Sequence, residues 1–419
     1  MMTKNKIIKQ ISKYWPIIKN HLLPRQPRTL FYWKFILPNQ TSDIQLHRKA
    51  FIKSLTRPPK PISGLFNLYS LLLWYVFFAW LTCYRIWKNT SEKHVEASGL
   101  NRWQQLIDLL TLSLVYCTPA QYYYRLRLYK YSSTQWLSFR FDHQTSHLHA
   151  INSPSISKRS SRLMADKHFF AKQLIKNNLP AIPTIALVKA GNTIDTTLLF
   201  NKKSLFLKPN NGSRSMGCYV LHYCDDRQQY SIKINDEIIN EQDKITSHIN
   251  TLCQTKDYLI QPLLKNTPEF GDNLNKIDLI TIRLVTAIST IKNDKTTINK
   301  PEAISAILEV PAKNEGYELY IVNCKSGVAR APKNRKIITD KYQQSKDTPS
   351  LLEHPLPYWQ SIIESAVSAH NLCTDITTIG WDIAITPTGV AILEGNINWG
   401  LTAHQFEGPM LRALFKSAN

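Results

Sequence analysis

The sequence predicts an α+β fold preceded by a basic and mainly helical N-terminal region. From residue 166 onward, helical and strand-like patterns alternate along the chain. Before that point, residues 1–165 hold 24 Lys and Arg against 5 Asp and Glu, whereas the remaining 254 residues hold 28 against 25. We therefore expect three parts: an N-terminal region at 1–100 with an apolar segment at 65–84, a helical connector and linker at 101–165, and an α+β domain at 166–419.

Composition excludes several classes of protein. A chain of 419 residues with 43% hydrophobic residues can bury a substantial core, so disorder of the whole chain is excluded. Seven cysteines without a Cys-x-x-Cys pair fit a reducing compartment better than a disulfide framework or a zinc ribbon. The net charge of +22 requires an anionic partner or surface, or else a heavily solvated face.

The N-terminal region lacks the pattern of one compact core. Residues 1–60 contain six prolines and a single acid, Asp43, so we expect short helices there. Residues 65–84 carry no charge, and about 20 apolar residues are enough to cross a bilayer. Farther on, 106–129 is typical of an amphipathic helix broken near Pro119, and the polar, Ser-rich stretch 141–162 predicts a linker.

The α+β domain opens with a helix. Asp166 can cap it, its apolar face includes Phe169 and Leu174, and Pro180 follows its end. Strands and further helices follow in an order that predicts mixed α+β structure. We expect strands at 184–188, 205–208, 219–222 and 258–261, β-rich segments at 281–289, 303–310 and 318–323, helices at 237–253 and 358–371, and two closing strands.

The two closing strands form a predicted hairpin at 380–396. Residues 387–389, Pro-Thr-Gly, suit a three-residue loop. Counting back from that loop puts Asp382 directly opposite Glu394, and Asn396 lies on the same face. The hairpin therefore brings three oxygen-bearing side chains together.

This trio predicts a cation site. Two carboxylates that face each other away from water repel unless a cation lies between them, and carboxylates with an amide suit Mg²⁺. The alternative is a surface hairpin with cross-strand acids. The neighbouring Ile383, Ile385, Ile392 and Leu393 favour burial instead.

A second candidate segment follows the strand that ends at Lys208. A small, hydroxyl-rich loop follows it, and such a loop can approach phosphate oxygens with backbone N–H groups. The spacing from Gly212 to Gly217 is similar to a Walker loop, but Cys218 stands where that motif needs lysine, so we reject the Walker interpretation. A long hairpin with an exposed lysine is the alternative.

Together these segments resemble the ATP-grasp fold, in which two α+β subdomains clasp ATP. The likeness is greatest to the sugar-transfer-associated ATP-grasp group, related to glutamate ligases, and it implies subdomains at 166–262 and 263–419. The matching segments are Asp166-Lys167, Lys208-Pro-Asn-Asn-Gly-Ser with Gly217, Leu259-Ile-Gln-Pro262, Thr281-Ile-Arg-Leu-Val-Thr286 and Asp382…Glu394-Gly-Asn396, within 115–410.

The resemblance implies a role for each matching residue. Arg283 and Lys208 would be catalytic, with Arg283 holding an acyl phosphate or an acceptor carboxylate. Asp382, Glu394 and Asn396 would ligate Mg²⁺. The residues implied in binding ATP are Lys167 and Lys208 at the phosphates, Ser213, Arg214, Ser215 and Gly217 in the loop above them, and Ile260, Gln261 and Leu263 in a hinge that reads adenine.

The implied activity is that of an ATP- and Mg²⁺-dependent carboxylate-amine ligase in bacterial cell-envelope or polysaccharide biosynthesis. Its expected partners are small carboxylate and amine substrates, which can be sugar-linked, and nucleic acid is not expected. Two alternatives stay open. One is an ATP-grasp kinase with a hydroxyl acceptor. The other is a nucleic-acid-binding protein with a degenerate ATP fold, for which Arg and Tyr interleaved at 122–130 would be the evidence.

The apolar segment 65–84 then raises a conflict of topology. Basic residues crowd before it, so a single crossing would keep the N-terminus inside and place the ATP site outside, away from ATP. We expect the segment to lie in the interface of an anionic membrane, with the protein on the cytoplasmic face. A buried hairpin core docked on the catalytic body is the alternative.

Overall fold

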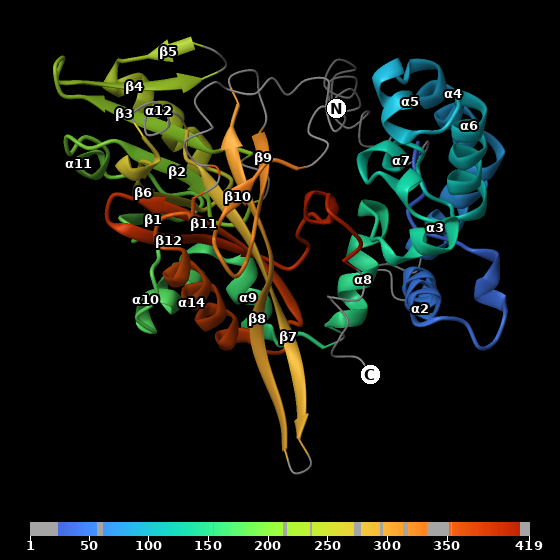
Figure 1. The fold of residues 1–419 in the computed structure, drawn as a ribbon. Helices are drawn as coiled ribbons and strands as arrows, with labels where there is room; N and C mark the ends of the chain where they lie inside the picture. The colour runs from blue at the N-terminus through green and yellow to red at the C-terminus, as the bar shows by residue number, and fades with distance from the viewer. Residues whose placement is uncertain are drawn as a thin grey trace. The chain divides into compact units, whose positions relative to one another are not determined.

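The chain folds as two compact units. The computed structural model describes residues 24–56, 62–153, 155–212, 216–234, 237–271, 278–293, 296–312, 317–332, 352 and 354–410. Unit 1 contains Met1–Pro154, Pro332–Tyr342 and Asn398–Asn419, and unit 2 contains Ser155–Ala331 and Gln343–Ile397. Unit 1 is helical where it is described, whereas unit 2 holds both sheets (Figure 1).

Unit 1 is helical, and within 24–56, where the prolines predicted short helices, it forms a four-residue 3₁₀ turn and a 15-residue helix. The break predicted near Pro119 lies between η3, which ends at Val115, and α7, which begins at Gln121. The elements are η1 (Trp33–Ile36), α2 (Ser42–Thr56), α3 (Ile62–Leu73), η2 (Trp74–Phe78), α4 (Ala79–Asn89), α5 (Glu92–Ser98), α6 (Arg102–Leu110), η3 (Thr111–Val115), α7 (Gln121–Arg125), η4 (Leu128–Lys130), η5 (Ser133–Ser138), η6 (Asp142–Gln144), α8 (Thr145–Asn152) and η10 (Ala403–Gln405).

The apolar segment predicted at 65–84 lies in one continuous helix formed by α3, η2 and α4. Its part Gly64–Asn89 is long and apolar enough to cross a membrane, judged by length and composition alone. The core helix of a soluble protein can be equally long and apolar. Length and composition therefore do not decide whether this helix lies in a membrane.

Unit 1 is closed by a segment that follows unit 2 in the chain. The side chain of Gln405 brackets the backbone of Arg140, accepting from its N–H at 2.8 Å and donating to its carbonyl at 2.7 Å. Thr402 donates its hydroxyl to Asp142 at 2.8 Å. Residues before 154 and after 398 thus share one hydrogen-bonded core.

The first sheet of unit 2 contains six antiparallel strands in the order β1-β6-β2-β3-β4-β5. Ile245 and Ile249 of α12 and Leu199 of α11 pack with its buried residues in one apolar core. The elements are β1 (Ala186–Val188), α11 (Thr196–Leu199), β2 (Leu205–Pro209), β3 (Tyr219–Cys224), β4 (Gln229–Ile234), β5 (Glu237–Ile239), α12 (Gln242–Cys253) and β6 (Tyr258–Pro262).

The second sheet is also antiparallel, in the order β10-β9-β8-β7-β11-β12. Helices α10 and α14 contribute Phe170, Leu174 and Ile362 to its apolar core, and β7 and β8 form a long hairpin (Figure 1). The elements are α9 (Lys158–Ala165), α10 (Lys167–Lys176), η7 (Pro268–Phe270), β7 (Thr281–Asn293), β8 (Thr296–Pro311), β9 (Tyr317–Val322), β10 (Ala329–Arg330), α14 (Trp359–His370), η9 (Asn371–Cys373), β11 (Thr378–Thr386) and β12 (Gly389–Asn396).

The helix predicted at Asp166 is confirmed with its cap, because the Asp166 side chain accepts from the backbone N–H of Phe169 at 2.9 Å. The linker expected at 141–162 is wrong. It folds instead as η6, α8 and the start of α9. Ser157 caps the start of α9 by accepting from the backbone N–H of Ser160. A serine in this run therefore begins a helix and does not mark a linker.

The helix expected at 237–253 begins only at Gln242. Residues 237–239 form the edge strand β5, which pairs with β4 through Ile232 and Ile239. β-branched residues fit this pleated surface better than a helical turn. Strand β4 itself was not among the predicted strands.

Gly327 marks a turn where substitution should be costly. It has φ +72°, and an added Cβ would lie 2.4 Å from Cγ of Trp359. Gly191 has a similar φ, +85°, with nothing within 4 Å of an added Cβ. We expect Gly191→Ala to cost about 1–2 kcal/mol in the free energy of unfolding, from backbone conformation alone. Gly327→Ala should cost about 1–3 kcal/mol more, through overpacking. Urea denaturation of both variants measures the difference, and equal costs would contradict the packing argument.

Candidate active site

The hairpin of β11 and β12 pairs Asp382 with Glu394, as predicted, but its turn and its register near the turn differ from the prediction. Thr386 pairs with Gly389, so the turn has two central residues instead of the expected three. A bulge then places one extra residue, Leu393, on β12 and restores the register below it. The loop prediction was wrong, and the bulge compensates for it.

The three predicted metal ligands lie together. Asn396 Nδ2 is 3.2 Å from Asp382 Oδ2 and 3.3 Å from Glu394 Oε1. Asp382 is 8% exposed, and its chain neighbours Trp381 and Ile383 are fully buried in the apolar core on the other face of the sheet. The buried-face interpretation of the hairpin therefore holds over the surface alternative.

Arg283 joins this group from the neighbouring strand. On β7 it pairs with Asp382 of β11, and its guanidinium donates to both carboxylate oxygens, from Nε at 2.8 Å and Nη2 at 3.1 Å. Its Nη1 lies 3.5 Å from Oε1 of Glu309 on β8. Because the fork is bidentate, Arg283 is held firmly beside the carboxylates.

Protonation of the two acids differs because their surroundings differ. Burial raises the pKa of Asp382 to about 7, although Arg283 opposes the shift. Burial also acts to raise the pKa of Glu394, but Lys167 and Asn396 hold it below its usual value. Burial acts to lower the pKa of Arg283, and the facing Asp382 raises it above the usual value, so the guanidinium stays charged.

The donor set fits a hard divalent cation. No group of three His, Cys, Asp or Glu side chains that could hold a metal occurs among the residues with assigned positions, so the candidate consists of two carboxylates and an amide. Asn396 turns its amide nitrogen toward both acids. A half-turn of that amide would present oxygen instead, and carboxylate and amide oxygens are the ligands that Mg²⁺ prefers.

Lys167 reaches the same acids from α10. Its Nζ lies 3.7 Å from Oε2 of Glu394 and donates to the carbonyl of Gly212 at 2.6 Å. A hollow of about 310 Å³ is lined by Lys167, Gly212, Glu394 and Asn396 together with apolar residues of α9. Two of the predicted metal ligands and one predicted phosphate ligand therefore face one cavity.

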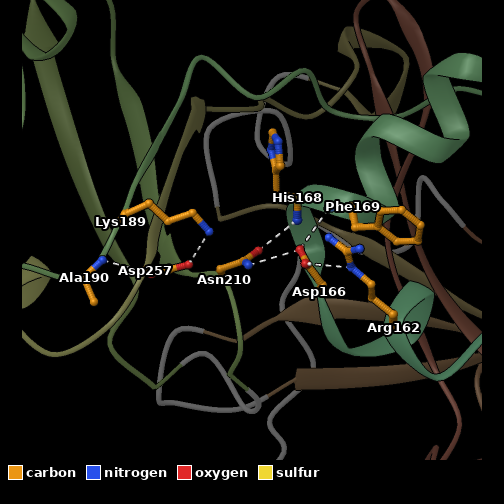
Figure 2. Close-up of polar contacts among 8 residues, drawn as sticks. All are labelled: Arg162, Asp166, His168, Phe169, Lys189, Ala190, Asn210 and Asp257. Atoms are coloured by element: carbon orange, nitrogen blue, oxygen red, sulfur yellow. Dashed lines mark hydrogen bonds and ion pairs between the residues drawn. The ribbon is translucent and has the colours of Figure 1, made fainter. Parts of the chain in front are cut away.

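Asn210 fixes the start of α10 against the loop that follows Lys208 (Figure 2). Its Oδ1 accepts from the N–H of His168 at 2.9 Å, and its Nδ2 donates to Oδ1 of Asp166 at 3.1 Å. The backbone N–H of Asn210 also donates to the carbonyl of Asp257. One amide side chain thus sets the position of Lys167 relative to Lys208.

Lys208 is 8% exposed at the end of β2. Burial lowers its pKa to about 8, the nearby Lys167 acts in the same direction, and Glu394 opposes both. An ammonium group at this position lacks the solvation that it has in water. An anion brought into the site would restore favourable interactions.

The other predicted nucleotide-binding residues have mixed placements. Ile260 and Gln261 lie inside β6, where the carbonyl of Ile260 accepts from Ile185, and the N–H of Leu263 donates to Ser204 just beyond the strand. Gly217 has φ +78°, and its carbonyl accepts from the hydroxyl of Tyr258. Ser213, Arg214 and Ser215 lie outside the described residues. The adenine and loop roles stay predictions.

Sequence reasoning missed Glu309, Asn210 and the anchoring role of Asp166. Glu309 stands in an apolar strand pattern, and only the pairing of β7 with β8 places it beside Arg283. Asn210 lies in a polar loop where an amide carries no distinctive signal. A second hollow, of about 420 Å³, runs along α12 and is lined by none of the predicted site residues.

Replacing Asn210 should loosen this end of the site. Asn210 is 3% exposed, so Asn210→Ala leaves the N–H of His168 without its acceptor, at a cost of about 1–3 kcal/mol in the free energy of unfolding. Asn177→Ala, at the exposed end of the same helix, is the control and should cost less than about 1 kcal/mol. Denaturant midpoints check the prediction, and similar losses in both variants would refute it.

We compared the chain with protein families, curated proteins and solved structures. The family model described as sugar-transfer associated ATP-grasp matches residues 148–418. No curated protein matches the chain. Among solved structures, D-alanine–D-alanine ligase from Bacillus anthracis complexed with ATP is similar at 13% identity and TM-score 0.33, covering 63% of each chain. N5-carboxyaminoimidazole synthetase from Staphylococcus aureus complexed with ADP is similar at 10% identity and TM-score 0.37, covering 66% of this chain and 58% of its own.

The chain thus spans less than two thirds of the length of those two proteins. ATP-grasp ligases use ATP and Mg²⁺, which agrees with the donor set of the hairpin. The family match covers well over half of this chain, and it includes both sheets and every side chain of the candidate site. The chain belongs to the sugar-transfer-associated ATP-grasp family.

Proposed function

We propose that this protein is an ATP- and Mg²⁺-dependent ligase that joins a carboxylate to an amine through an acyl phosphate. The observation that carries the proposal is the convergence of Asp382, Glu394 and Asn396 with Arg283 and Lys167 at one face of the second sheet. This arrangement sets cationic side chains beside two acids. It suits a reaction in which negative charge is moved between phosphate and carboxylate oxygens.

In the proposed reaction, a carboxylate oxygen of the first substrate attacks the γ-phosphorus of ATP, and ADP leaves. The amine of the second substrate then attacks the carbonyl carbon of the acyl phosphate. Phosphate leaves with the bonding electron pair, and the nitrogen loses a proton to give the amide. Mg²⁺ held by Asp382, Glu394 and Asn396 would supply charge neutralisation at the phosphate oxygens.

The chain's own cations have separate tasks in this scheme. Lys167 and Lys208 would bind the phosphates, because both extend from elements that meet at the Asn210 anchor. Arg283 would hold the acyl phosphate, since its guanidinium lies beside Asp382 and its fork matches phosphate oxygens. Glu309 keeps that guanidinium oriented from the opposite side.

We also propose a setting for the reaction, namely bacterial cell-envelope or polysaccharide biosynthesis at the cytoplasmic face of the membrane. The association of the family with sugar transfer supports sugar-linked substrates. The charge of residues 1–165 and the apolar helix of unit 1 support an anionic membrane as partner.

ATP binding should be coupled to proton uptake at Lys208. Because the pKa of this side chain is about 8, part of the population is neutral at pH 8, and phosphate oxygens favour the charged form. Calorimetry at pH 8 in buffers of different ionisation enthalpy should therefore show uptake, which should fade toward pH 6, where Lys208 is already protonated. Lys208→Met should abolish the uptake and weaken ATP binding by about 1.5–3 kcal/mol.

Lys176→Met, at the exposed end of α10, serves as the matched control and should keep both the uptake and the affinity. If ATP binds Lys208→Met as tightly as the natural protein, Lys208 is not a phosphate ligand.

Phosphate release tests the ligase assignment. The full chain with ATP, Mg²⁺, pooled amino acids and nucleotide-sugar carboxylates should release ADP and phosphate together, and only when both a carboxylate and an amine are present. Asp382→Asn should lower the rate by at least about 10²-fold without unfolding the protein, because it removes a predicted ligand and leaves the shape unchanged. Asp243→Asn, exposed on α12, is the control and should keep full activity.

Two results would overturn this proposal. ADP formation without free phosphate would indicate a kinase with a hydroxyl acceptor. Full activity of Asp382→Asn would show that Asp382 is not a ligand of the Mg²⁺ that the reaction requires.

A further inference from the structure

The helix formed by α3, η2 and α4 presents two different sides. One side is buried and includes Asn67, Ser70, Leu71, Trp74, Ala79 and Cys83. The other is an exposed apolar stripe, which is at least 38% exposed at every position and consists of Leu65, Leu68, Tyr69, Leu72, Val76, Phe77, Trp80, Leu81 and Tyr84. Nine large apolar side chains on one surface exceed what solvent-facing helices normally carry.

A π turn keeps this stripe in line. Buried positions follow at steps of three and four up to Trp74, and the next is Ala79, five residues on, across the π turn Trp74–Phe78. An uninterrupted α-helix would drift past that point, because its period of 3.6 residues does not match repeated steps of four. The turn therefore keeps Val76, Trp80 and Tyr84 on the side already formed by α3.

Polar side chains on the buried side of the helix form hydrogen bonds with other segments of unit 1. Asn67 Nδ2 donates to the carbonyl of Ser54 at 2.7 Å, and Trp74 Nε1 donates to the carbonyl of Ser113 at 2.9 Å. The backbone N–H of Arg28 donates to the hydroxyl of Ser70 at 3.1 Å. A helix that crossed a bilayer alone would lose these partners, and each unsatisfied polar group would be costly in hydrocarbon.

The stripe continues onto α6. Trp87 of α4 connects the stripe to α6, because its ring centroid lies 6.5 Å from that of Tyr84 and 5.7 Å from that of Trp103, with the rings tilted in both pairs. Trp103 is 68% exposed and Ile107 of the same helix is 63% exposed. Trp and Tyr at the edge of an apolar surface are typical of the level of lipid headgroups.

Positive charge borders the stripe. Lys88 Nζ lies 5.9 Å from the ring centroid of Tyr84, and Arg85 is exposed beside it. Residues 1–165 carry 19 more basic than acidic side chains, whereas the rest of the chain is almost balanced. Apolar and aromatic surface edged by cations complements an anionic bilayer better than it complements water or a second equally basic copy.

We propose that the stripe, with Trp103 and Ile107, lies flat in the headgroup region of an anionic bilayer, so that the helix binds one face of the membrane and does not cross it. The inference rests on the membrane setting proposed above and adds the surface and the topology. Residues on both sides of the helix then stay on the same side of the membrane.

Vesicle binding of the purified full chain tests the surface. Leu72 and Val76 are 60% and 69% exposed in the stripe, and Ile175 and Ile238 of unit 2 are 50% and 69% exposed outside it. The double variant Leu72→Asp with Val76→Asp should bind phosphatidylcholine vesicles containing phosphatidylglycerol at least about 10²-fold more weakly than the natural protein. The control, Ile175→Asp with Ile238→Asp, should bind normally, and vesicles of phosphatidylcholine alone should bind less protein.

The other outcomes separate the proposals. Equal weakening by both double variants, or loss of dimers instead of vesicle binding in the stripe variant, would overturn the surface. A fragment around 62–89 that resists external protease on sealed vesicles would overturn the flat topology in favour of a crossing. If the natural protein ignores all vesicles while phosphate release is intact, the membrane setting fails and the ligase proposal stands.

Discussion

Two acids face each other on a buried antiparallel pair, and their mutual repulsion is the constraint around which unit 2 is organised. Asp382 and Glu394 could not both stay charged there alone. Arg283 reaches them from β7, Lys167 from α10 and Asn396 from β12 itself. Each partner comes from a different element. The helix α10 and three strands of the sheet must therefore be in place before the pair is stable.

Part of this site was predictable from the sequence. The period of two in a strand and the oxygen-bearing side chains at 382, 394 and 396 were sufficient to bring the trio together. The loop was misjudged because a two-residue turn and a bulge at Leu393 compensate for each other, and neither has a clear sequence signal. The place of Arg283 beside Asp382 depends on the pairing of β7 with β11, which are far apart in the chain. The place of Glu309 beside Arg283 depends on the register of the hairpin of β7 and β8, which local pattern does not reveal.

Helix caps were predictable where a single acid made the contact, as at Asp166. Polar runs were not. The serines at 153–161 suggested a linker, yet Ser157 and Ser160 both bond to Asp375 across the unit, and that partner lies more than 200 residues away. Two histidines that precede these serines in the chain are buried in unit 1. Burial lowers the pKa of His143 and of His149 to about 3, so both are neutral at physiological pH.

The bracket of Gln405 around Arg140 has a consequence for how the chain leaves the ribosome. Residues 398–410 complete unit 1, although the whole of unit 2 is synthesised between them and the N-terminal helices. The contacts of Gln405 and Thr402 with Arg140 and Asp142 can therefore form only after unit 2 has been synthesised. The apolar stripe, which is exposed even in the folded protein, is accessible throughout that time. Synthesis order thus favours early capture of that stripe by whatever apolar surface lies nearest to the growing chain.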